Sequence, residues 1–429
     1  MATITADLSK QLKKIKPLHA GGQPPVLSNA KDTYFHYLTE AGIPYARLHD
    51  MSPRYADIHV VFPDFNADET DPASYDFVFT DLLMEQLSAA GVEPYYRLGE
   101  TIENAARVKA YYVHPPKDYE KWARICEHII RHYTEGWANG YHYNITYWEV
   151  WNEPDNGRQM WSGSFEDYYR LYEVASKHLK ACFGDKIKIG GFASCGFYGV
   201  AGGNDPFNMK PEHYQKYLDF FHGFMQHVKE HDCPIDFFSW HSYAPLGNTL
   251  RMDQYVAEQL EAYGYGHIES HLNEWNPFQE EAGNGHHAAE IAATILALQN
   301  GRTDVACIYD MRMSHASYAA LFDVKLALPH QTYYTFVAFN TLYKLGQQVE
   351  CISNTEGLYA VAATDGKKHA LMISNVSGST HALAFEGVDL SDARYSYIDD
   401  RRLLSWAPNA KELQNNSVVL IEWRSPTPQ

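Results

Sequence analysis

Two glutamates in similar surroundings are the residues of this sequence best suited to chemistry. Glu153 stands in the run YWEVWNEPDNG (147–157), between an asparagine and a proline. Glu274 stands in HIESHLNEWNP (267–277), where an apolar run again ends in Asn-Glu. Two carboxyl groups held about 5–5.5 Å apart can cleave a glycosidic bond with retention, one as the nucleophile and the other as acid and base. The pair therefore suggests this chemistry, provided that the fold brings the two side chains together.

The proline after Glu153 indicates where that glutamate lies. Proline cannot donate to a sheet ladder, so we expect the strand to stop before Pro154. Glu153 then lies at the carboxyl end of a parallel strand, where barrel enzymes place their active sites. Trp148 and Trp151 are expected to supply apolar surroundings, which raise a carboxyl pKa by disfavouring the charged form. A general acid that works near neutral pH needs such a raised pKa.

The elements that must position these glutamates alternate along the chain between short apolar runs and amphipathic stretches. The runs predict strands at 45–48, 93–98, 146–151, 186–190, 236–240, 268–273 and 306–310, with a weaker eighth before Gly21. The stretches predict helices at 30–41, 76–90, 119–132, 166–183, 212–231, 253–263, 286–300 and 333–345. Alternating strands and helices form parallel βαβ units, and eight of each fit a closed (β/α)8 TIM barrel over residues 17–346.

The residue pattern changes after Gly346, where segments alternate apolar and polar residues between turns such as DGKK and SGST. This period of two predicts a small antiparallel β-sandwich domain over residues 347–429. The N-terminal residues 1–16 are candidates to pack with it. The fold class is thus α/β, with a barrel followed by an accessory β domain.

The charge and composition of the chain indicate which classes of partner it is not expected to bind. The formal net charge of −18 disfavours nucleic acid, which needs a basic surface. No apolar run is long enough to span a bilayer, and the polar N-terminus lacks a signal-peptide core, so we expect no membrane association and a cytoplasmic location. The six cysteines are scattered without a C-x-x-C pair, which predicts free thiols rather than disulfides or a zinc site.

The motifs together resemble glycoside hydrolase family 39 of clan A. The strings EVWNEPD, DFFSWHSY and EWNP fall on the fourth, sixth and seventh predicted strands, and the resemblance extends from Arg47 to Leu345 and into the trailing β domain. It implies a retaining exo-glycosidase that acts on a small carbohydrate or oligosaccharide, with no cofactor and no metal. It also implies that Glu153 is the acid/base and Glu274 the nucleophile.

The resemblance further implies a set of substrate-binding residues. Asn152 resembles the asparagine that hydrogen-bonds the sugar 2-hydroxyl. Arg47 resembles the arginine near the nucleophile, and a cation there keeps Glu274 ionised. The other candidates are expected to orient the nucleophile, to contact sugar hydroxyls or to stack on a ring: His241 and Tyr243, His49 and Asp50, and Trp275.

Two nearby features are interpreted as structural. Glu149 precedes Glu153 by four strand residues, roughly 13 Å, so we expect it to pair inside the barrel with a base such as Arg97 instead of sharing the site. His286, His287 and Glu290 have helical spacing without a further partner, which favours a helix start over a metal site.

The identity of the sugar stays open. β-Xylosidases of the family show H-G-x-x-x-D-D after the second strand, whereas this chain has LHDMSPRYADIHVVFPDF, whose Arg54, Tyr55, Asp57 and His59 border the expected subsite. β-Xylosidase is the default, and an arabinosidase, galactosidase or glucosidase is the alternative. A non-catalytic sugar-binding barrel and a metal-dependent barrel lyase or isomerase are the competing classes. The sequence does not decide whether the protein is a homo-oligomer.

Overall fold

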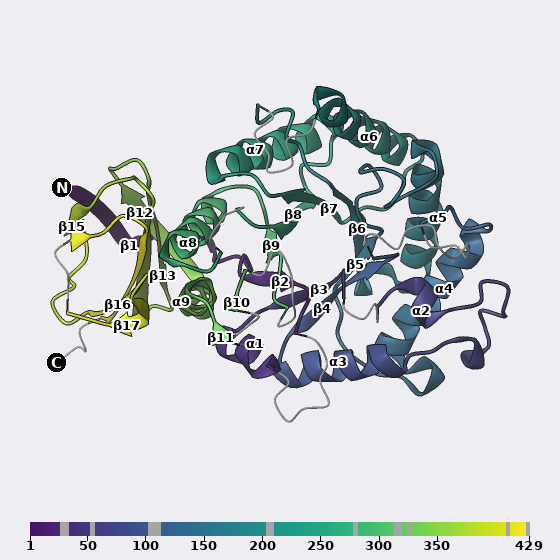
Figure 1. The fold of residues 1–429 in the computed structure, drawn as a ribbon, viewed down its shortest axis with the longest axis horizontal. Helices are drawn as coiled ribbons and strands as arrows, with labels where there is room; N and C mark the ends of the chain where they lie inside the picture. The colour runs from purple at the N-terminus through teal and green to yellow at the C-terminus, as the bar shows by residue number, and fades with distance from the viewer. Residues whose placement is uncertain are drawn as a thin grey trace.

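The computed structural model contains a barrel ringed by helices and a second body of β-strands beside it (Figure 1). It describes residues 1–25, 34–51, 56–101, 113–202, 210–277, 282–312, 320–323, 326, 328–408 and 412–425. None of the described helices is long and apolar enough to cross a membrane. All six cysteines are free thiols.

Eight parallel strands close the barrel in chain order, which confirms the predicted fold class. The strands are β2 (Ala20–Gly22), β3 (Tyr45–Leu48), β4 (Glu93–Leu98), β5 (Tyr147–Val150), β6 (Lys188–Ser194), β7 (Phe237–Ser242), β8 (Glu269–Trp275) and β9 (Val305–Ile308). Two of them, β3 and β4, have the predicted bounds. β5 ends at Val150, short of the expected residue 151, and β8 continues past the predicted end through Glu274 to Trp275.

Helices surround the barrel and bury one face of each against it (Figure 1). They are α1 (Phe35–Ala41), α2 (Ile58–Val61), α3 (Val78–Ala90), α4 (Tyr119–Glu135), α5 (Phe165–Phe183), α6 (Pro211–Glu230), α7 (Leu246–Tyr263), α8 (Gly285–Asn300) and α9 (Gln331–Leu345), with short 3-10 turns at Pro72–Ser74, Trp137–Asn139 and Gly184–Lys186. The local sequence determines where several of these helices begin. Ser164 and Asp167 form a capping box at α5, and Asn284 caps α8 by accepting from the amide of His287.

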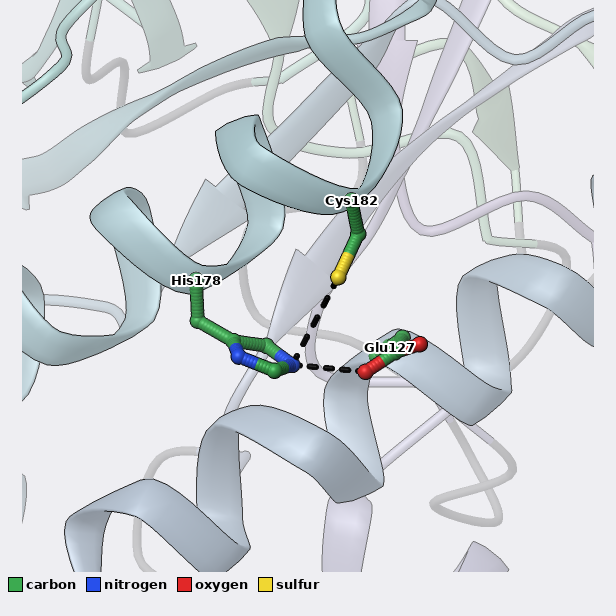
Figure 2. A group of neighbouring side chains, drawn as sticks. All are labelled: Glu127, His178 and Cys182. Carbon is green, nitrogen blue, oxygen red and sulfur yellow. Dashed lines mark hydrogen bonds and ion pairs between the residues drawn. The ribbon is translucent and has the colours of Figure 1, made fainter.

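A polar contact joins two outer helices of the barrel (Figure 2). His178 and Cys182 lie one turn apart on α5, so they share a helix face. The Nε2 atom of His178 lies 2.6 Å from Oε2 of Glu127 on α4 and 3.7 Å from Sγ of Cys182. Hydrogen bonding among these three side chains accounts for their proximity on the outside of the barrel.

The second body is a nine-stranded sheet with the order β17-β16-β19-β14-β13-β12-β1-β15-β18. Its strands are β1 (Ala2–Lys14), β12 (Gln347–Ser353), β13 (Leu358–Thr364), β14 (Lys368–Asn375), β15 (His381–Glu386), β16 (Arg394–Asp399), β17 (Arg402–Trp406), β18 (Glu412–Leu413) and β19 (Ser417–Arg424). A separate hairpin, β10 (Phe322–Asp323) with β11 (Leu328–Pro329), precedes α9.

The N-terminal strand is an interior member of this sheet. β1 pairs antiparallel with β12 and parallel with β15, so one pair departs from the antiparallel pattern predicted for the domain. One side of the sheet lies against α8 and α9 of the barrel (Figure 1). A second apolar cluster, which includes Ile4, Leu371 and Ile421, lies within the sheet domain itself.

Candidate active site

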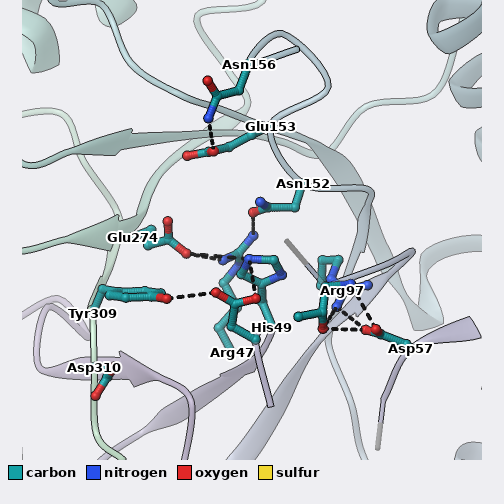
Figure 3. A network of polar contacts seen from close by, with 12 residues as sticks. Arg47, His49, Asp57, Arg97, Asn152, Glu153, Asn156, Glu274, Tyr309 and Asp310 are labelled. Atoms are coloured by element: carbon teal, nitrogen blue, oxygen red, sulfur yellow. Dashed lines mark hydrogen bonds and ion pairs between the residues drawn. The ribbon is translucent and has the colours of Figure 1, made fainter. Parts of the chain in front are cut away.

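The side chains expected to act together meet at the carboxyl ends of the barrel strands (Figure 3). Nδ1 of His241, on β7, lies 2.7 Å from Oε1 of Glu153 and 3.1 Å from Oε2 of Glu274. One carboxylate oxygen of Glu153 lies within 4.8 Å of one of Glu274. Carboxyl groups of inverting glycosidases stand about 6.5–9.5 Å apart, and those of retaining ones about 5–5.5 Å. This oxygen–oxygen separation is short enough for the retaining arrangement.

The backbone that presents Glu153 leaves the sheet abruptly. β5 ends at Val150, and Trp151 and Glu153 have φ values of 74° and 44°. Left-handed backbone is disfavoured for residues with a Cβ and clusters at functional sites, where the surrounding structure holds it in place. Here the amide of Glu153 donates to the carbonyl of Ala193, and the Nδ2 of Asn156 donates to Oε2 of Glu153 at 2.8 Å.

Arg47 connects the second glutamate to its neighbours. From β3 its Nη1 donates to Oε1 of Glu274 at 3.2 Å, and its Nη2 donates to Oδ1 of Asn152 at 2.7 Å. The hydroxyl of Tyr243 donates to the other oxygen of Glu274 at 3.0 Å. Nε2 of His49 lies 3.9 Å from Glu274. Four of the predicted residues thus contact Glu274 directly, namely Arg47, His49, His241 and Tyr243.

Glu149 has a different partner from the one predicted. Nε of Arg47 donates to Oε2 of Glu149 at 2.8 Å, and Ser239 donates to Oε1 at 2.6 Å. Arg97 instead donates to Asp57. The prediction that Glu149 is a buried ion-pair residue within the barrel is confirmed, but its pairing with Arg97 is wrong.

The match to a family model decides the classification of this chain. The model "Glycosyl hydrolases family 39" matches residues 3–275, a segment that contains β2 to β8 and both glutamates. The chain belongs to glycosyl hydrolase family 39. This membership confirms the resemblance stated from the sequence.

Two relatives that are named as β-xylosidases support the same family. A β-xylosidase of Geobacillus stearothermophilus is 23% identical over 344 residues, which cover 70% of this chain and 62% of that protein. A β-xylosidase of Caldicellulosiruptor saccharolyticus is 27% identical over 163 residues, 36% of this chain and 31% of that protein. The family 39 chain thus spans less than two thirds of the length of these curated relatives in each alignment.

Solved structures share the whole fold. The crystal structure of a glucosidase from Croceicoccus marinus has a TM-score of 0.81 at 19% identity and covers 100% of both chains. That of a monomeric β-xylosidase from Caulobacter crescentus CB15 has a TM-score of 0.70 at 16% identity and covers 98% of this chain and 99% of that one. At these identities the likeness concerns the fold.

The electrostatics of the family 39 site differ from the expectation for Glu153. Burial raises the pKa of Glu153, but hydrogen bonds from His241 and Asn156 outweigh burial and lower it. Trp148 stacks on Tyr96, and the indole of Trp151 packs edge-on against that of Trp161. The predicted rise in this pKa is therefore wrong, because the hydrogen bonds and the neighbouring imidazole together outweigh burial.

The second glutamate and the histidine shift in the opposite direction. Burial raises the pKa of Glu274, and the charges of His241 and Arg47 counteract this only in part. Burial works against the charged form of His241, but Glu274 and Glu153 raise the pKa of its imidazole. Three groups in such contact exchange protons as a unit, so the proton distribution depends on what lies between them.

Tyr309 is a site residue that the sequence analysis missed. It follows β9, its hydroxyl donates to Oδ2 of Asp50 at 2.8 Å, and its ring lies edge-on to Tyr243 with centroids 5.9 Å apart. Burial and the charge of Glu274 raise the pKa of Asp50 to about 7. The available signal was an aromatic residue near the end of the strand predicted at 306–310, where the sequence pattern indicates only a strand.

Trp275 and the segment after β3 are the remaining residues that were predicted to border the sugar. Trp275 is 1% exposed and packs in the main hydrophobic core, because successive strand residues point to opposite faces. Its position does not support stacking on a sugar. Arg54 and Tyr55 lie outside the described residues, whereas Asp57 accepts from Arg97 and His59 contacts Glu100.

Replacing Arg47 by methionine is expected to destabilise the fold strongly. The variant leaves Glu149 and Glu274 buried without their cation, which costs about 3–5 kcal/mol. Urea unfolding followed by circular dichroism measures the loss. Arg302→Met is the matched control, since Arg302 pairs with Glu261 at the surface and its loss should change stability by less than about 0.5 kcal/mol. Equal stability of both variants would contradict the assigned role of Arg47.

Removing the Tyr243 hydroxyl is expected to shift the acidic limb of the pH–activity profile to higher pH. The hydrogen bond to Glu274 lowers the pKa of that carboxyl, so Tyr243→Phe raises it, and less of the carboxylate is ionised at acidic pH. A hydrogen bond to a charged group contributes about 1.5–3 kcal/mol, which corresponds to a shift of about one pH unit or more. The kcat/KM of an aryl glycoside against pH measures it. Tyr172→Phe, whose hydroxyl bonds the Pro234 carbonyl, should leave the profile unmoved.

Proposed function

We propose that this protein is a retaining exo-glycoside hydrolase, with Glu274 as nucleophile and Glu153 as acid/base, and that β-xylosides are its substrates. The observation that carries the proposal is the approach of the two carboxylates, within 4.8 Å at the carboxyl ends of β5 and β8 with His241 between them. This separation suits attack on an anomeric carbon by one group and proton transfer by the other.

In the first step, Glu274 attacks the anomeric carbon and Glu153 gives its proton to the leaving oxygen. The bond from the anomeric carbon to the leaving oxygen breaks as the ester to Glu274 forms. Arg47 and Tyr243 hold Glu274 by its two oxygens and favour its charged form. Glu153 must carry a proton at this moment. An uncharged sugar between the carboxylates removes water from Glu153 and weakens its contact with His241, and both changes raise its pKa.

In the second step, Glu153 takes a proton from water, and the resulting oxygen nucleophile attacks the anomeric carbon. The ester bond breaks, Glu274 regains its charge, and the free sugar leaves with the configuration of the substrate. Asn152, which Arg47 holds by its Oδ1, keeps its Nδ2 free to donate to a sugar hydroxyl next to the reacting carbon.

The proposed sugar rests on the relatives. The two relatives described above are named β-xylosidases, which supports a β-xyloside as the first substrate to test. The solved structure with the TM-score of 0.81 is a glucosidase, so a glucoside is the second candidate. Arabinosides and galactosides remain the further alternatives within the same chemistry.

A panel of aryl glycosides tests the function. We expect the aryl β-xyloside to be cleaved with the highest kcat/KM, and proton NMR at early times to show the β-anomer of xylose first. The α-anomer appearing first would reject retention. Turnover of no glycoside, together with sugar binding by calorimetry, would favour a binding barrel, and activity lost to a chelator would favour the metal-dependent class.

A further inference from the structure

Arg97 is a buried cation with unused hydrogen-bond donors. It lies on β4, is 0% exposed, and donates through Nη2 to Asp57 at 2.6 Å and to Thr101 at 3.4 Å. Its Nε and Nη1 have no hydrogen-bond partner among the described residues. Burying an unpaired donor is unfavourable, and more so when the group is charged. Folding alone gives no reason to retain two such atoms on one side chain.

Other unpartnered atoms lie in the same part of the site. Among the described residues, buried polar atoms without a hydrogen bond include Nδ1 of His49, Oδ1 of Asp50, Nδ2 of Asn152 and Nε2 of His241. Arg97 lies close enough to two of them to act on their charges. Burial lowers the pKa of His49 and the charges of Arg47 and Arg97 lower it further, whereas Arg97 opposes the burial that raises the pKa of Asp50.

The positions of these atoms indicate which parts of a ligand they could bind. In the view of Figure 3, Arg97 and Asp57 lie on one side of His49, and Glu274 and Tyr309 lie on the other. No hydrogen bond or ion pair joins Arg97 to Glu153 or Glu274 among the described contacts. A ligand that reaches both the glutamates and Arg97 therefore has its reacting carbon at one end and acceptor oxygens at the other.

The charge of the site indicates which acceptors these are. A guanidinium offers only donors, so its partner must be an acceptor oxygen. Asp57 already balances the charge of Arg97, and Arg47 faces the two carboxylates of Glu149 and Glu274. With Glu153 in addition, the surroundings are net negative, which disfavours a sugar carboxylate. Hydroxyl oxygens of an uncharged sugar fit both conditions.

We infer that Arg97 is a substrate-binding residue that donates to the C3 and C4 hydroxyl oxygens of a neutral glycone, the hydroxyls remote from the reacting carbon. The inference rests on the proposed glycosidase function and names its substrate class. It also explains why the side chain is held by Asp57 and Thr101 at a single nitrogen: the fixed Nη2 orients the plane of the guanidinium and leaves Nε and Nη1 available.

A cycle that deletes the donor and the acceptor separately tests the contact. The kcat/KM of wild type and of Arg97→Met is measured on the best aryl glycoside of the panel and on its 3-deoxy and 4-deoxy analogues. Loss of a hydroxyl that bonds a charged donor should cost the wild type roughly 10- to 100-fold. In Arg97→Met the same deletion should cost less than about 3-fold at one hydroxyl or both, because the partner is already gone. Equal losses in both proteins, at both positions, would overturn the inference.

Two further variants keep the test decisive. Arg97→Lys retains a cation beside Asp57 and is used if the methionine variant does not fold. It should discriminate less between the glycoside and its deoxy analogues, since an ammonium lacks the planar donor arrangement. Asp57→Asn keeps a hydrogen-bond acceptor for Nη2 and should keep the wild-type discrimination. A uronoside cleaved faster than the neutral glycoside would overturn the neutral class. Unchanged discrimination with normal turnover overturns this inference alone, whereas a wild type without any turnover overturns the proposed function and this inference with it.

Discussion

Replacing Glu274 by glycine is expected to lower kcat on an aryl β-xyloside by roughly 10⁵-fold or more. Without the carboxylate no glycosyl ester forms, and the residual rate comes only from binding and acid catalysis. Arg47 and Tyr243 lose one partner each but keep other contacts, so the fold should survive. Initial rates at saturating substrate measure the loss, and thermal unfolding verifies the fold.

The cavity left in Glu274→Gly provides a second readout. Azide can occupy it and attack the anomeric carbon from the same face, while Glu153 protonates the leaving oxygen. The product is then a glycosyl azide of inverted configuration, identified by NMR. Glu269→Gln is the matched control, because Glu269 lies on the same strand at the opposite end of the barrel, paired with Lys188, and should keep near-normal activity. Residual activity above about one hundredth of wild type would reject Glu274 as nucleophile.

Replacing Glu153 by glutamine is expected to produce a loss that depends on the leaving group. An amide cannot give a proton, so substrates with a poor leaving group should lose about 10²–10⁴-fold in kcat/KM. Substrates whose leaving group needs no proton should lose little in kcat/KM. Their kcat should still fall, because Glu153 also activates water in the second step.

A series of aryl glycosides with graded leaving groups measures this dependence. The slope of log kcat/KM against leaving-group pKa should steepen in Glu153→Gln, and a burst of released phenol should appear with the best leaving groups. Glu166→Gln, on the exposed first turn of α5, is the control and should give the wild-type slope. An unchanged slope in Glu153→Gln would assign acid catalysis to another group.

The sequence contained enough information for the barrel and for the two glutamates. The runs at Tyr45–Leu48 and Glu93–Leu98 predicted β3 and β4 residue for residue, because a buried parallel strand is rich in apolar residues. Pro154 showed that β5 had to end nearby. The motif strings then placed both glutamates at the same end of the barrel.

Contacts across the barrel could not be predicted, because they depend on strand register. Glu149 was expected to pair with Arg97, its register neighbour on β4, but Arg47 of the next strand reaches it instead. The lowered pKa of Glu153 had the same origin, since His241 is 88 residues away in the chain. Tyr309 escaped notice because an aromatic residue after a strand has no distinctive pattern.

The place of β1 has a consequence for how this protein is made. β1 lies between β12 and β15, two strands that follow the whole barrel in the sequence. During synthesis, β1 therefore stays without these two partner strands until the whole barrel has been made. The order of synthesis and the order of assembly differ, and a truncation that removed β1 would divide the sheet in its interior and create two unprotected edges.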